Sequence, residues 1–211
     1  MLLTQKQEDA LIGFVNLILS RRTATALSEL IQSPVVLEVS GISLYPLSKC
    51  ATEFTDTLKN DVASIHQILS GPHAGDCLML LDYYVAVMLT NLLCRRSGQP
   101  IVHLNVSACE VLTEMGNILL GSFVRILGNL MGGSISISDQ LFSIDPFDQL
   151  VNSLIVEHEE IRYVLIVDLT FLLCDNSVPG YLLFVSGVMP LSCAIRGIEA
   201  LGNLAGSKYL R

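Results

Sequence analysis

The stretch that decides the fold is residues 108–121, ACEVLTEMGNILLG, where three polar side chains interrupt an apolar helical pattern. Glu110, Glu114 and Asn117 are four and three residues apart, so at about 100° per residue they share one narrow stripe with Gly121. Apolar residues cover the opposite side of such a helix: Val111, Leu112, Met115, Ile118, Leu119 and Ile126. The pattern predicts a core helix with one solvated face.

The composition is that of a folded domain rather than a disordered chain. Of the 211 residues, 51% are hydrophobic and 15% are charged, which is enough apolar material for one domain or two closely joined halves. The net charge is −8 with only 12 Lys and Arg residues. Because clustered cations drive binding to a phosphate backbone, the sequence disfavours a nucleic-acid partner.

The apolar runs are expected to be buried elements of a soluble protein rather than membrane spans. The most apolar window, residues 77–94, contains Asp82, Thr90 and Asn91, and a span would place Asp82 near mid-membrane. Two buried elements with Asp82 at the turn between them explain this window better. The first residues lack a basic segment followed by an apolar run, so we expect a cytoplasmic protein without membrane insertion.

Six single cysteines are spread along the chain without a CxxC pair. This spacing matches neither a zinc site nor a compact disulfide framework. We therefore expect reduced, buried cysteines and no metal bound by this chain.

An internal repeat organises the sequence. When Asn16 is aligned with Asn117, Leu11 matches Leu112 and Leu19 matches Leu120 in the same register. After a one-residue slip, Leu27 matches Leu127 and Leu30 matches Leu130. The repeat predicts one domain, residues 1–211, made of two repeats at about 1–98 and 99–211 and separated by RRSGQP at 95–100.

Each repeat is predicted to begin with a long helix and to continue with strands. The first repeat should contain helices at about 5–32 and 83–95 and strands near 35–47, 62–69 and 76–81. The second should contain helices at about 106–131, 147–155 and 191–203, a strand within SISISDQLFSI, and strands at 162–174 and 180–185 joined by a hairpin turn at NSVPG, 176–180. This order predicts an α+β fold with pseudo-twofold symmetry, whose long helices pack on a mostly antiparallel sheet covered on both faces.

The segment EMGNILLG resembles the E-x-G-N-I-x-x-G helix of the CheC/CheX/FliY phosphatases of chemotaxis. The segments ATALSELI, ISLYPLSK and HAGDCLMLLD are also similar to that family, and the duplication resembles CheC in particular. The likeness covers nearly the whole chain and implies a duplicated CheC-like fold.

The resemblance also implies a function in two-component signalling, the hydrolysis of the aspartyl phosphate on a CheY-like response regulator. By this likeness Asn117 orients the attacking water and Glu114 contacts the active-site Lys of the regulator. Phosphoryl transfer requires little covalent work from the protein, and an amide can both donate to and accept from one water. The chain itself is expected to bind no cofactor, with Mg²⁺ held by the phosphorylated partner.

The second repeat departs from the family pattern at two places. Glu110 stands where the family has Asp or Ser, and it either hinders approach to an acidic pocket or adds a contact to the partner's Lys. Asp139 and Gln140 occupy the region of a family proline.

The first repeat departs further. It keeps Asp9 and Asn16, but Gly13 replaces the carboxylate and Val15 and Ser20 replace the two glycines. We interpret it as a degenerate, inactive second site.

A second hypothesis belongs to a different class of function. The same fold serves as the middle domain of FliM, which binds partners without phosphatase activity, so the chain is alternatively a binding module for a response regulator or for the deamidase CheD. No G-x-S-x-G, P-loop or G-x-G-x-x-G motif supports another enzyme class.

Overall fold

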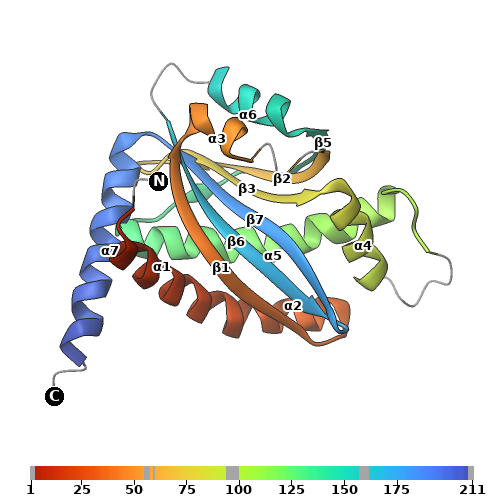
Figure 1. Ribbon diagram of the computed structural model, residues 1–211, viewed down its shortest axis with the longest axis horizontal. Helices are drawn as coiled ribbons and strands as arrows, with labels where there is room; N and C mark the ends of the chain where they lie inside the picture. Colours follow the sequence, from red (N-terminus) through yellow and green to blue (C-terminus); the bar gives the residue numbers. More distant parts are fainter. Residues whose placement is uncertain (1–2, 55–57, 59, 94–99, 157–161, 209–211) are drawn as a thin grey trace.

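The computed structural model describes residues 3–54, 58, 60–93, 100–156 and 162–208. Its strands form one seven-stranded sheet in which every pairing is antiparallel, with helices on both faces (Figure 1). This architecture confirms the predicted α+β class.

The first repeat contains helices α1 (Gln5–Ile18), α2 (Ala24–Ile31), α3 (Leu47–Phe54) and α4 (Tyr83–Leu93), the π-helical segment η1 (Leu19–Thr23), and strands β1 (Val35–Pro46), β2 (Asp61–Ser70) and β3 (Gly75–Asp82). The second repeat contains helices α5 (Val106–Met131), α6 (Phe147–Val156) and α7 (Val188–Lys208), and strands β4 (Ser136–Ile137), β5 (Leu141–Pro146), β6 (Tyr163–Leu173) and β7 (Asn176–Ser186).

The strand order expresses the predicted pseudo-twofold symmetry. The sheet runs β1-β6-β7-β3-β2, and β5 and the two-residue β4 both pair with the far side of β2. By their order after the long helix of each repeat, β1, β2 and β3 correspond to β5, β6 and β7. Exchanging the corresponding strands gives the same strand order, read from the opposite edge of the sheet. The pseudo-twofold axis therefore passes between β3 and β7. This symmetry supports our proposal of one domain with two repeats; the junction at 95–100 lies outside the described residues except for Pro100.

Two apolar cores lie on opposite faces of the sheet. The larger one is formed by α1, α2, α5 and part of α7 against one face, and α5 contributes many of its buried side chains, including Leu112, Leu119 and Phe123. The smaller one lies under α3 and α6, which pack together on the other face (Figure 1). The prediction that both faces are covered is confirmed.

The one-residue slip in the repeat alignment has a structural cause. The first long helix changes from α to π geometry over Leu19–Thr23 and then returns to α geometry at Ala24. A π turn accommodates one additional residue within a helix. Leu27 therefore faces the core like Leu19, although it lies eight residues after Leu19 whereas Leu127 lies seven residues after Leu120 in α5.

The hairpin predicted at NSVPG is wrong by a few residues. Cys174 and Asp175 form the turn, with φ of 50° and 64°, and Leu173 pairs with Asn176 across it. Two consecutive residues with positive φ are typical of a type I′ turn, whose twist matches the flanking strands. NSVPG instead begins β7, where Pro179 lies beyond the residues that pair with β3, so its missing N–H breaks no bond on that side.

Helix α3 was not expected from the sequence.

The apolar window at 77–94 forms two elements, as predicted. It divides into β3 and α4, and Asp82 at the junction accepts a hydrogen bond from the Tyr84 backbone N–H at 2.9 Å. Among the described residues one helix, α5, is long and apolar enough to cross a membrane, with a mean hydropathy of 1.3. Because α5 packs into the larger core, its apolar character is that of the central helix of a folded domain.

A buried ionic cluster joins three segments on the face covered by α3 and α6. Asp76 of β3 accepts a hydrogen bond from His66 of β2 at 3.0 Å, and Arg162 approaches its other carboxylate oxygen at 2.8 Å. Burial alone raises the pKa of Asp76, but the hydrogen bond from His66 and the charge of Arg162 outweigh it and hold the pKa below its usual value. The cluster cross-links β2, β3 and the start of β6.

The cysteines in the described part of the chain are free thiols. Cys50 and Cys77 are buried, and Cys109, Cys174 and Cys193 are half-buried, so burial is less complete than expected. Burial raises the pKa of Cys50 to about 12, which leaves it protonated and unreactive.

Candidate functional site

Helix α5 begins and ends at residues that cap it. Asn105 is extended, and its side-chain oxygen accepts a hydrogen bond from the Ala108 backbone N–H at 2.9 Å. Gly132 ends the helix in the left-handed region with φ of 71°, and its N–H donates to the Gly128 carbonyl. The two caps match the helix predicted at 106–131 and fix the position of the motif along it.

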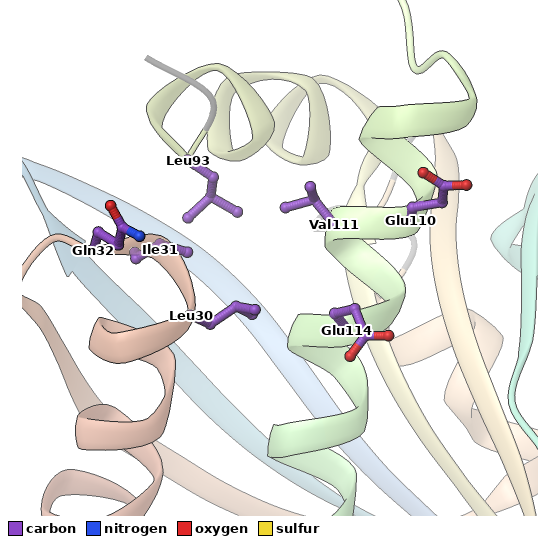
Figure 2. A pocket seen from close by; sticks show the side chains of 7 residues that line it. All are labelled: Leu30, Ile31, Gln32, Leu93, Glu110, Val111 and Glu114. Atoms are coloured by element: carbon purple, nitrogen blue, oxygen red, sulfur yellow. The ribbon is translucent and has the colours of Figure 1, made fainter. Parts of the chain in front are cut away.

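The polar stripe faces solvent as predicted. Glu110, Glu114 and Asn117 are exposed, while Met115 and Gly116 between them are buried. Figure 2 shows the carboxylates of Glu110 and Glu114 projecting from the same side of α5, one turn apart. The three candidate residues of the second repeat therefore lie together on an accessible surface.

Gly116 allows α5 to approach the sheet closely. A Cβ atom at this position would lie 2.9 Å from Ile65 Cγ2 and 3.0 Å from Ile65 Cβ, shorter than ordinary carbon contacts. Ile65 belongs to β2, which pairs with β3 on one side and with β4 and β5 on the other. Because Gly116 has no side chain, α5 can pack closely against β2. The exposed stripe of α5 then lies beside the segment that leads into β5.

Two shallow hollows flank Glu110 and Glu114, which line both of them. The first, of about 360 Å³, is also lined by Leu30, Ile31, Gln32, Leu93 and Val111. The second, of about 470 Å³, is also lined by Leu104, Asn105, Val106, Cys109 and Thr113. In Figure 2 the side chains of Val111, Leu30 and Leu93 point into the first hollow while the carboxylates turn away from it. The two glutamates form an acidic ridge with a largely apolar hollow on either side.

Asn117 has a neighbour that the sequence did not reveal. With its amide oriented to satisfy both ends, Gln140 Nε2 donates to the Thr113 carbonyl at 3.1 Å and Oε1 accepts from the Asn117 backbone N–H at 3.0 Å. The same oxygen lies 3.2 Å from Asn117 Oδ1, and the two side chains form a hydrogen bond only when the Asn117 amide also turns its nitrogen toward Gln140. Gln140, one of the two residues that stand in the region of the family proline, therefore lies beside Asn117. The sequence did not predict this contact because the two residues are far apart in the chain.

The equivalent residues of the first repeat have different surroundings. Asn16 is half-buried, and its side-chain oxygen accepts a hydrogen bond from the Val39 backbone N–H at 3.3 Å. Asp9 is exposed and accepts a hydrogen bond from Gln5 Nε2 at 2.9 Å. Gly13, at the position of the missing carboxylate, is exposed with nothing near the place of a Cβ. Asn16 and Asp9 therefore have structural roles as hydrogen-bond acceptors within the protein. This supports the interpretation of a degenerate site.

The candidate site contains carboxylates and an amide on a solvated surface. Within the described ranges, no three His, Cys, Asp or Glu side chains lie together in a way that could hold a metal ion. The arrangement can bind a cation at Glu114 and hydrogen-bond a water or phosphoryl oxygen at Asn117.

No protein-family model matches this sequence. The fold is similar to that of FliY from Thermotoga maritima, with a TM-score of 0.72 and 16% identity over 97% of this chain and 99% of that one. It is also similar to the FliM middle domain from H. pylori (TM-score 0.62, 11% identity, 92% and 99% of the two chains). A chain of the H. pylori FliG–FliM complex matches with a TM-score of 0.65 and 10% identity over 92% and 99%. At these identities the likeness establishes the fold, and it confirms the CheC-like fold expected from the sequence resemblance.

Proposed function

We propose that this protein is a phosphatase that accelerates hydrolysis of the aspartyl phosphate on a CheY-like response regulator in the cytoplasm. The observation that carries the proposal is the joint exposure of Glu114 and Asn117 on one stripe of α5, which Gly116 holds against the sheet. A fold shared with FliY supports it.

The proposed reaction uses few protein groups. A water attacks the phosphorus, the bond from phosphorus to the regulator's aspartyl oxygen breaks, and the products are inorganic phosphate and the free carboxylate. Asn117 accepts a hydrogen bond from the water and donates one toward the phosphoryl oxygens, and this fixes the line of attack. Glu114 pairs with the regulator's active-site Lys. The Mg²⁺ that neutralises the phosphoryl charge belongs to the regulator.

The surface around the stripe suits a protein partner. The acidic ridge of Glu110 and Glu114 provides charge for a basic side chain, and the hollows on both sides provide apolar contact area. Regulator docking over α5 would cover all of these groups at once.

The test is phosphate release from a panel of phosphorylated response regulators in the presence of Mg²⁺. We expect the protein to accelerate release from at least one of them well above its own rate. Equal rates with and without the protein across the panel would exclude the proposal.

A binding module without catalysis is the second candidate. Its supporting observation is the exposed Glu110, a second carboxylate one turn from Glu114 that would repel an acidic phosphorylation pocket. The fold shared with FliM, for which a complex with FliG is known, is compatible with this role. Tight binding of a phosphorylated regulator, or of CheD, without faster hydrolysis would favour it over the phosphatase.

A further inference from the structure

We propose that Gln140 is a positioning residue of this site, which holds the Asn117 amide in the orientation needed for hydrolysis. The inference rests on the proposed function. It concerns a residue that lies outside the motif helix, 23 positions beyond Asn117 in the chain.

Both the nitrogen and the oxygen of the Gln140 side-chain amide form hydrogen bonds with the motif helix α5. Its nitrogen donates to the Thr113 carbonyl at 3.1 Å, and its oxygen accepts from the Asn117 backbone N–H at 3.0 Å. Thr113 and Asn117 are the two ends of one helical turn. The amide of Gln140 therefore spans the turn that carries Asn117.

The same oxygen lies 3.2 Å from Asn117 Oδ1, so a hydrogen bond between the two side chains requires the Asn117 amide to be turned until its nitrogen takes that place. When the Asn117 amide turns its nitrogen toward Gln140, one of its two N–H groups is occupied. The other N–H and the carbonyl oxygen then remain directed outward for a water and a phosphoryl group. An exposed Asn without such a neighbour would sample several side-chain orientations.

Gln140 can act as a restraint because the preceding segment is fastened to the sheet. The Ser138 hydroxyl accepts from the Ile68 backbone N–H at 2.9 Å, and the Ser138 N–H donates to the Ile68 carbonyl at 3.0 Å. The amide of the buried Gln67 donates to the Ser138 carbonyl at 3.4 Å. Directly after Gln140, Leu141 pairs with His66 in the ladder between β5 and β2. These contacts hold the segment around Gln140 against β2. This is the same strand against which α5 packs closely at Gly116.

The chemistry suits an amide at this position. A carboxylate would repel the phosphoryl group, and a cation would add a charge beside the Asn117 amide. A neutral amide orients Asn117 without adding charge beside the reaction.

The kinetic test compares Gln140→Met with Gln140→Glu and with Gln149→Met, a matched control at an exposed glutamine of α6. Gln140→Met removes both hydrogen bonds at similar length, and we expect kcat to fall on the order of ten-fold with KM for the phosphorylated regulator unchanged. Gln140→Glu keeps an acceptor toward Asn117 but loses the donor to the Thr113 carbonyl and adds a charge beside the phosphoryl group, so it should also lower kcat. Gln149→Met should match the wild type. Unchanged kcat in Gln140→Met, or a loss explained by a lower melting temperature, would overturn the inference.

A second measurement separates this inference from the proposed function. In the labelled wild-type protein we expect a nuclear Overhauser contact between the side-chain amides of Gln140 and Asn117, and Gln140→Met should shift the Asn117 side-chain resonances. Absence of the contact refutes the positioning role even if the enzyme is active. If the wild type accelerates no hydrolysis, the proposed function fails and the positioning role in catalysis fails with it, while the Overhauser contact still decides whether Gln140 holds Asn117.

Discussion

Asn16 Oδ1 accepts a hydrogen bond from the Val39 backbone N–H at 3.3 Å, beside the irregularity where β1 shifts its register against β6. Asn117, the equivalent residue of the other repeat, presents its side chain to solvent. One repeat therefore uses the asparagine to anchor a strand, and the other leaves it available to a partner. This difference allows the two roles to be tested within one molecule.

Asn117→Ala should remove most phosphatase activity without affecting the fold. Because the side chain is exposed, we expect the free energy of unfolding to change by less than about 0.5 kcal/mol. The rate of phosphate release should fall on the order of a hundred-fold, since the water loses its orienting partner. Asn129→Ala, at an exposed asparagine of the same helix, is the control and should remain fully active. Full activity of Asn117→Ala would remove this residue from the mechanism.

Asn16→Ala should show the opposite pattern, a loss of stability with little loss of activity. The substitution leaves the N–H of the buried Val39 without this partner, which typically costs about 1–3 kcal/mol. Urea unfolding measures this change, and phosphate release should stay within about two-fold of wild type. The double variant with Asn117→Ala should be as inactive as Asn117→Ala alone. A large loss of rate in a folded Asn16→Ala protein would establish a second active site instead.

Glu110→Ser tests whether the second carboxylate hinders docking. If Glu110 repels an acidic pocket, the substitution should increase the association rate of the regulator at low salt, and the increase should shrink at high salt. Stopped-flow binding at two ionic strengths measures both effects. Glu53→Ser, at an exposed glutamate of α3, serves as the control for net charge. Slower association of Glu110→Ser would mean that Glu110 contacts a cation of the partner.

The two motif glycines should respond differently to alanine. At Gly116 the added methyl would meet Ile65 at 2.9 Å, so Gly116→Ala should destabilise the protein by about 1–3 kcal/mol despite the better helix propensity of alanine. At Gly121 no atom lies within 4 Å of the place of a Cβ, so Gly121→Ala should be neutral or stabilising by up to about 1 kcal/mol. Thermal unfolding of both variants decides the matter. Equal effects would contradict the close approach of α5 to β2.

Asp76→Asn should weaken the fold and flatten its response to acid. The pKa of Asp76 is lowered from 3.8 in the folded protein, so its contribution to stability is present above that value and disappears as the pH falls through the folded pKa. The stabilities of wild type and variant should therefore differ at pH 7 and converge in acid. Denaturant unfolding between pH 7 and pH 3 tests this, with the exposed Asp61→Asn as control. A constant difference across that range would contradict the ionic role.

The elements that were predicted correctly from the sequence are marked by features within the element itself. The Asn105 and Gly132 caps delimit α5, and periodic apolar residues place its buried side. The parts that failed depend on weaker or distant signals. Helix α3 is only eight residues long, and NSVPG contains residues typical of turns although two residues with positive φ make the turn before it. The contact of Gln140 with Asn117 joins two elements through β2, which periodicity cannot reveal.

The pairing of strands across the pseudo-twofold axis has a consequence for how such a chain can evolve. One strand of each repeat pairs with the hairpin of the other, β1 with β6 and β5 with β2, so neither repeat completes the sheet from its own strands. Two identical single-repeat chains could build the same sheet as a homodimer, but every change in one asparagine would then occur in both. Fusion into one polypeptide removes that constraint. It lets Asn16 become a structural anchor while Asn117 stays on the surface.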